Sequence, residues 1–170
     1  MGSYINIGLA GGKDSLVDNF ISFVNNISDF KFISVNYPEE NDYNNWLCVK
    51  SGKLTLKEAL EYCIKNEMAY IDSSINFNGK SIYGVDITCE KVGMDLAAFI
   101  IKIPEELLVE DLDQSEEIII KLLMKAEGFE CAFCDSEAHL EDRKYAIYVD
   151  YSGNASVSYN SWKIDGYTKR

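Results

Sequence analysis

The sequence predicts an α+β fold in which about three helices pack on a mixed, mostly antiparallel sheet. Stretches in which apolar and polar residues alternate, the pattern of half-buried strands, outnumber the stretches with helical spacing. The pair Asn78-Gly79 separates two β-rich stretches, 68–77 and 81–90, as in a tight hairpin whose turn residues take positive φ. Strands and helices do not alternate regularly, so helices covering one face of a largely antiparallel sheet is the economical arrangement.

Length and composition predict a single globular domain over residues 1–170. Hydrophobic residues make up 47% of the chain, which is enough for a core and argues against disorder. The two prolines are Pro38 and Pro104, and no Gly/Ser/Pro-rich linker marks a boundary. The sequence does not start with a basic region followed by an apolar run, and no apolar segment approaches the roughly 20 residues of a membrane helix. We therefore expect a cytoplasmic protein with no membrane partner.

The first unit expected is a strand over residues 3–9, a glycine turn and an amphipathic helix. Either Asp14 or Ser15 would cap this helix, since both carry a side-chain oxygen. Strands joined by a helix can pair in parallel, and for this reason a mixed sheet is predicted. The glycines expected to supply positive φ or a close backbone approach are Gly8, Gly11 and Gly12.

Two further helices and a series of strands follow. Thr55 is expected to cap a helix, with Glu58 completing the capping-box pattern, and Ser115 is expected to cap another. The segments 37–45 and 135–142 are polar and acidic and are interpreted as exposed loops. Strands are expected over 31–37, 46–50, 68–77, 81–90, 96–103, 129–134, 145–151 and 155–162.

The formal net charge of −12 restricts the kind of partner. An acidic surface repels phosphate backbones, so binding to nucleic acid is not expected. The same charge favours encounter with a basic protein, because opposite fields speed association. A basic protein domain is therefore the partner class that the composition predicts.

Three acidic segments, 39–42, 105–117 and 135–142, lie beside aromatic residues. Aromatic anchors inside a charged rim are typical of protein-binding surfaces. We expect the contacts to come from the first and third segments. The residues predicted to bind a partner are Glu39, Glu40, Asp42, Tyr43, Trp46, Asp135, Glu137, Glu141 and Asp142.

Residues 10–15, Ala-Gly-Gly-Lys-Asp-Ser, resemble the phosphate-binding motif of the PP-loop ATP pyrophosphatases, in which Ser-Gly-Gly-x-Asp-Ser joins a strand to a helix. Ala10 stands where that family has Ser, which removes a hydroxyl donor, and basic residues for a triphosphate are sparse. We interpret the segment as the turn that begins the first helix and keep a nucleotide-binding enzyme as the alternative. In that alternative, the resemblance assigns phosphate binding to Gly11, Gly12, Lys13, Asp14 and Ser15.

The cysteines do not predict a site. There are five, and an odd number within apolar patterns indicates free thiols in a reducing compartment. Cys131 and Cys134 form a Cys-x-x-Cys pair near Glu137 and His139, but a structural zinc site needs four ligands and His139 is the only histidine. We predict no metal, no cofactor and no catalytic residues, and therefore no enzyme.

The chain as a whole resembles the immunity proteins of bacterial polymorphic toxin systems, which are small, acidic α+β proteins without catalytic motifs. The features that carry the resemblance are the opening segment 1–8, Trp46, the Asn78-Gly79 pair and the aromatic-rich C-terminal strands. The resemblance implies a protein that binds a cognate toxin domain, often a nuclease, and blocks its active site. It assigns no individual residues.

Overall fold

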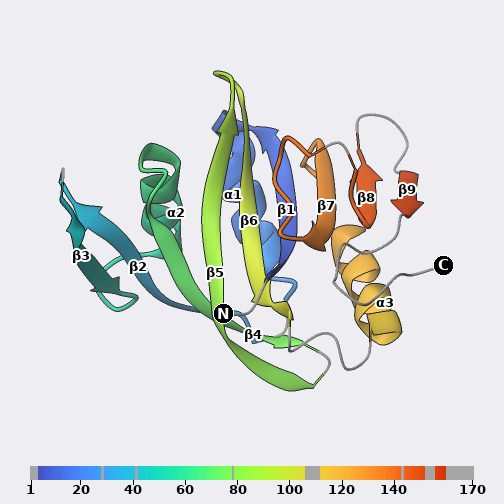
Figure 1. Cartoon of the computed structure of the whole chain (residues 1–170), viewed down its shortest axis with the longest axis horizontal. Helices are drawn as coiled ribbons and strands as arrows, with labels where there is room; N and C mark the ends of the chain where they lie inside the picture. Colours follow the sequence, from blue (N-terminus) through green and yellow to red (C-terminus); the bar gives the residue numbers. More distant parts are fainter. Residues whose placement is uncertain are drawn as a thin grey trace.

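The computed structural model describes residues 4–27, 29–40, 42–77, 79–105, 112–142, 144–151 and 156–159. Within these ranges, three helices cover one face of a nine-stranded sheet (Figure 1). The helices are α1 (Lys13–Val24), α2 (Leu56–Lys65) and α3 (Leu112–Leu123). The strands are β1 (Tyr4–Gly12), β2 (Lys31–Glu39), β3 (Asp42–Lys50), β4 (Tyr70–Phe77), β5 (Lys80–Val92), β6 (Leu96–Pro104), β7 (Cys131–Ser136), β8 (Ile147–Asp150) and β9 (Ser156–Tyr159).

The predicted α+β fold is confirmed. The strand order is β3-β2-β4-β5-β6-β1-β7-β8-β9, and all eight neighbouring pairs of these described strands are antiparallel. Strands β1 and β2 point the same way, but β6, β5 and β4 lie between them. The strand–helix–strand unit therefore forms no parallel pair, and the sheet is not mixed in the part described.

The glycine turn expected before the first helix is wrong. Gly11 and Gly12 are the last residues of β1, paired with Ala97 and Leu96 of β6. Neither has positive φ, and α1 begins at the next residue. Gly12 itself is the N-cap, without a side-chain cap, so the capping predicted for Asp14 or Ser15 is wrong as well. The cause is the length of β6, which keeps the chain extended to the first helical residue.

Of the caps predicted for the other two helices, the one at α2 is confirmed and the one at α3 is wrong. The capping box at α2 is confirmed: the Thr55 hydroxyl accepts the Glu58 N–H at 3.2 Å and the Glu58 carboxylate accepts the Thr55 N–H at 3.1 Å. Ser115 does not cap α3, because this helix already begins at Leu112 and Ser115 lies buried within it. Gly128, expected to end α3, does not do so: the helix ends at Leu123, and Gly128 lies in a later turn with φ +96.

Two segments predicted to be loops are partly or wholly strand, whereas the hairpin predicted at Gly79 is present. The segment 37–45 is not a loop, because β2 and β3 run through it and leave only a tight turn between Glu39 and Asp42. The hairpin predicted between β4 and β5 is present, with φ +79 at Gly79, while Asn78 lies outside the described residues. The interpretation of 135–142 as a loop is wrong at its start, since β7 continues through Ser136.

Two apolar layers lie on the two faces of this sheet. The main core lies between the sheet and the three helices. In it, the ring centroids of Phe20 of α1 and Phe99 of β6 are 4.7 Å apart. A smaller cluster lies on the opposite face, over β1, β6 and β7, and includes Phe133 and Tyr145. This second layer covers only part of its face, and the remainder is the candidate site.

Candidate functional site

The face of the sheet away from the helices has two halves. We call the part over β6, β1 and β7 the covered half, because the segment after β7 crosses it (Figure 1). We call that segment the strap; its described residues are 137–142 and 144–146. We call the part formed by β3, β2, β4 and β5 the open half.

The covered half is a packed layer on small residues. A Cβ added to Gly8 would lie 2.0 Å from Cζ of Phe133, so only glycine leaves room for this ring. The Phe133 ring stacks on Tyr145 of the strap with centroids 4.2 Å apart, and the Tyr145 hydroxyl donates to the carbonyl of His139 at 2.8 Å. Burial raises the pKa of Tyr145 above its ordinary value, with the Asp142 carboxylate adding to the effect.

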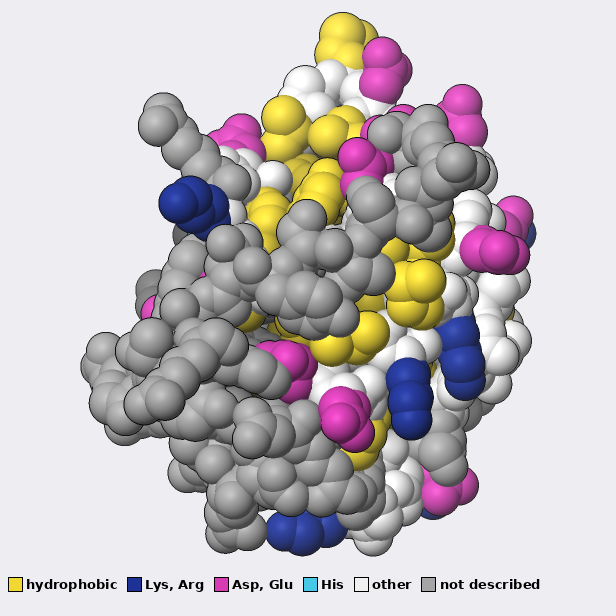
Figure 2. All heavy atoms as spheres, turned by 90° about the vertical axis from the view of Figure 1, so that its right-hand side faces the viewer, with side chains coloured by type: hydrophobic (Ala, Val, Ile, Leu, Met, Phe, Trp, Pro, Cys, Tyr) yellow, Lys and Arg dark blue, Asp and Glu magenta, His cyan; other side chains and the backbone are white. Residues whose placement is uncertain are grey.

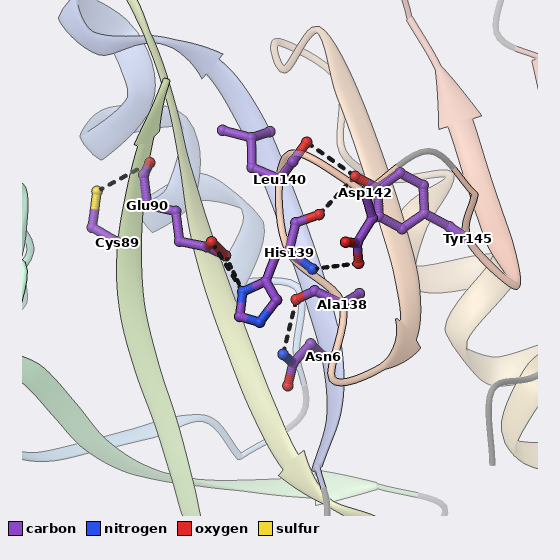
Figure 3. A network of polar contacts seen from close by, with 8 residues as sticks. All are labelled: Asn6, Cys89, Glu90, Ala138, His139, Leu140, Asp142 and Tyr145. Carbon is purple, nitrogen blue, oxygen red and sulfur yellow. Dashed lines mark hydrogen bonds and ion pairs between the residues drawn. The ribbon is translucent and has the colours of Figure 1, made fainter. Parts of the chain in front are cut away.

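Polar contacts hold the strap to the sheet (Figure 3). The Glu137 N–H donates to the carbonyl of Tyr4 at 2.8 Å, and Asn6 Nδ2 donates to the carbonyl of Ala138 at 2.9 Å. His139 Nδ1 lies 3.1 Å from a carboxylate oxygen of Glu90 on β5. The strap is thus attached to both β1 and β5, and it forms the border of the open half.

Asp135 is part of this attachment. It is only 1% exposed, and its two carboxylate oxygens accept the backbone N–H groups of Ser136 at 2.7 Å and Ala146 at 2.9 Å. A buried carboxylate with these bonds stabilises the end of β7 and the end of the strap. Asp135, predicted to bind a partner, is therefore inside the molecule. The reason is that β7 continues to Ser136, two residues beyond the predicted end of the strand.

The open half carries two carboxylates directly opposite each other. The register pairs Asp72 of β4 with Asp86 of β5, and Asp86 in turn with Lys102 of β6. Like charges at opposed positions of adjacent strands destabilise a sheet. The pKa of Asp86 is raised to about 6, first by burial and second by the Asp72 carboxylate, while Lys102 acts in the opposite direction.

Aromatic side chains extend this surface toward the edge of the sheet. Trp46 of β3 lies 5.9 Å from Tyr70 of β4, ring centroid to ring centroid, and stays 42% exposed. Burial raises the pKa of Tyr70, and the carboxylates of Asp86 and Asp72 add to it, which places the phenol in the field of both acids. The open half therefore combines a half-exposed indole, a phenol and two carboxylates on one continuous surface.

The residues predicted from the sequence fall into separate places. Glu39, Glu40 and Asp42 are exposed at the tip of the β2–β3 hairpin, beside Trp46, and the Glu39 carboxylate accepts the Asn45 amide. The side chain of Tyr43 lies outside the described residues. Glu137 and Glu141 are exposed on the strap, where Asp142 accepts the His139 N–H at 2.9 Å. Four strands separate the two groups, so they form no single surface.

Sequence reasoning missed Tyr70, Asp72 and Asp86. A signal was present, since each acid stands beside buried residues such as Ile71 and Ile87 in a strand pattern and so must point to the other face. That pattern shows that the acids leave the helix-covered core. It does not show that they meet.

The alternative nucleotide site is not assembled. A phosphate loop presents free backbone N–H groups before a helix. Here Gly11 and Gly12 belong to the β1–β6 ladder, and the N–H of Lys13 donates to the carbonyl of Asp95 at 3.0 Å. With Gly11 and Gly12 extended, Asp14 and Ser15 lie in the first turn of α1 without forming a cradle.

The Cys-x-x-Cys pair is also not assembled as a site. Cys131 and Cys134 are three residues apart in β7, so their sulfurs point to opposite faces of the sheet. Burial raises the pKa of both thiols above the ordinary value, which keeps them protonated and unreactive. Among the described residues, no group of three or more His, Cys, Asp or Glu side chains is placed to hold a metal ion.

Comparisons with known proteins assign no family. No protein-family description matches the chain, and no curated protein matches it. Among solved structures, the chain is similar to one described as Pseudomonas aeruginosa T6SS protein PA0821, at 13% identity and a TM-score of 0.36. The match covers 79% of this chain and 41% of that structure, so the chain spans about two fifths of its length. Separately, no helix of the described residues is long and apolar enough to cross a membrane.

Proposed function

We propose that this chain is an immunity protein that binds and neutralises a cognate, basic toxin domain, such as a nuclease, in the cytoplasm. The observation that carries the proposal is the opposed pair Asp72 and Asp86 on the open half. Two carboxylates held together on a partly buried surface destabilise the free chain, and an arginine or lysine of a partner between them would relieve this repulsion.

The surroundings of the acid pair fit such a partner. Trp46 supplies a half-exposed aromatic anchor, the residue type that most often dominates binding energy. Glu39, Glu40 and Asp42 form an exposed acidic rim at the adjoining hairpin. A formal charge of −12 would speed the encounter with a basic domain. We infer that the face acts by covering the toxin's active site and not by chemistry of its own.

The rest of the predicted surface takes a secondary place in this proposal. Glu137, Glu141 and Asp142 lie on the strap, beyond the border of the open half. They contribute to the long-range field and lie outside the proposed contact. Asp135 is buried and contributes through the stability of the strap alone.

The experiment that tests the proposal is protection of a living cell. A candidate basic toxin domain is expressed in a bacterial host with the chain, without it, and with the Asp72→Lys/Asp86→Lys variant. The expected result is survival with the native chain and killing in the other two cultures. Killing despite abundant native chain would overturn the proposed function, and full protection by the variant would overturn the proposed surface.

A further inference from the structure

A cavity of about 280 Å³ opens on the helix-covered side, where α1 ends and α3 passes the sheet. Its floor is formed by strand residues of the main core, among them Ile7, Ile101 and Ile103. Ile27, just after α1, and Ile118 of α3 form two of its walls. This cavity lies on the opposite face of the sheet from the open half, so it is independent of the proposed toxin contact.

The charged groups among the described lining residues are both lysines, although the chain as a whole carries a formal net charge of −12. Lys121 and Lys125 line the cavity, and no carboxylate is among the described lining residues. The described residues provide neither lysine with an ion pair. Figure 2, which views the molecule from the side of α3, shows basic side chains near apolar ones on this side, with acidic side chains close by.

A third polar group stands at the same place. Asn76 of β4 lines the cavity, and its Oδ1 accepts the N–H of Gly79 at 3.1 Å. A second amide, Asn26, also lines the cavity, and its Nδ2 donates to the carbonyl of Ser22 at 3.1 Å. Among the described lining residues, the cavity thus combines an apolar floor with two amides and two lysines.

We propose that this cavity binds a free medium-chain fatty acid, with its alkyl chain on the isoleucine floor and its carboxylate between Lys121 and Lys125. An apolar cavity at the small end of ligand-site volumes suits a single chain of about ten carbons. Charge-assisted bonds from two ammonium groups select a carboxylate over a neutral or cationic head. The proposal goes beyond the proposed function and does not depend on it.

The test is calorimetric titration of the full chain with decanoate below its micelle concentration, compared with decyltrimethylammonium, which has the same chain and a cationic head. The expected result is saturable binding of decanoate and none of the cation. Lys121→Gln/Lys125→Gln should weaken decanoate binding by about tenfold or more. The matched control is Lys57→Gln/Lys65→Gln, which makes the same charge change on exposed residues of α2 and should leave binding unchanged.

A filling variant tests the interior without removing charge. Ile27 is only partly buried, so Ile27→Trp places an indole in the cavity with little disturbance of the core. It should abolish decanoate binding while the thermal unfolding midpoint stays near that of the native chain. The proposal is overturned by no saturable heat with decanoate, by equal binding of the cationic amphiphile, or by equal weakening in the α2 control variant.

Discussion

The two halves of one sheet face differ in what their side chains do for the folded chain. In the covered half, Phe133 fills the space above Gly8 and the strap closes over it. In the open half, Asp72 and Asp86 face each other, and Trp46 is 42% exposed. One face of the sheet thus carries a stabilising layer over β6, β1 and β7 and a destabilising pair of carboxylates on β4 and β5. Stability explains the first half, and we propose that binding explains the second.

The largest effects are expected in the covered half. Phe133→Ala should lower the free energy of unfolding by about 3–5 kcal/mol, because it empties a fully buried site. Gly8→Ala should cost about 3 kcal/mol, since the new Cβ collides with the Phe133 ring. In the Phe133→Ala background the Gly8→Ala change should cost much less. Urea unfolding of the four chains measures this coupling, and additive effects would contradict the packing described.

The next effect concerns the attachment of the strap. Asp135→Asn should lower the free energy of unfolding by about 2 kcal/mol, because an amide cannot accept both backbone N–H groups. Asp142→Asn is the matched control, as Asp142 accepts the N–H of His139 on a more exposed part of the strap. A larger loss in the control, measured by urea unfolding, would contradict the assigned role.

In the open half, by contrast, removing a carboxylate should raise the free energy of unfolding. The pKa of Asp86 in the folded chain, about 6, lies above the ordinary 3.8, so between these values the folded chain holds the proton more tightly. Stability due to this group therefore falls as the pH rises from about 4 to about 6. Asp86→Asn should raise the free energy of unfolding by roughly 1 kcal/mol at pH 8, after allowance for solvent screening.

The pH dependence is the control for this prediction. Near pH 3 the Asp86 carboxyl is protonated in both states, so the gain from Asp86→Asn should vanish. Urea unfolding of both chains at pH 8 and pH 3 gives the comparison. A destabilised Asp86→Asn chain at pH 8 would mean that the carboxylate stabilises the fold and that the two halves do not differ as described.

The smallest effect is expected at the border between the halves. His139 and Glu90 form a partly exposed pair, and such pairs contribute little after screening. His139→Ala should change the free energy of unfolding by less than about 0.5 kcal/mol. Thermal unfolding at neutral pH measures it, and a loss as large as that of Asp135→Asn would show that the strap depends on this contact.

Local patterns predicted most of the fold. The capping box at Thr55, the hairpin at Gly79 and the alternation within the strands depend on near neighbours in the chain, so the sequence predicts them. The glycine turn at Gly11 and Gly12 could not be excluded in this way. Whether Gly11 and Gly12 form a turn or a strand depends on how far β6 extends beside β1. That pairing joins residues more than 80 positions apart in the chain.

The candidate site could not be predicted for a similar reason. A tight hairpin that pairs Phe77 with Lys80 would place Asp72 opposite Val85 if the register stayed constant. A bulge between Ser73 and Ile75, with positive φ at Gly84 on the other strand, shifts the pairing by one residue. The shift brings Asp72 opposite Asp86. The acid pair is thus a product of the irregularity, which the alternating pattern does not reveal.

The central claim is that the open half binds a basic toxin domain, and association kinetics test it most directly. The rate of binding to the candidate toxin domain is measured for Asp72→Lys/Asp86→Lys and for Glu137→Lys/Glu141→Lys, which changes the charge equally on the strap. We predict that the first variant loses both association rate and lifetime of the complex, whereas the second loses only part of the association rate. Equal losses in the two variants, or a greater loss on the strap, would contradict the account.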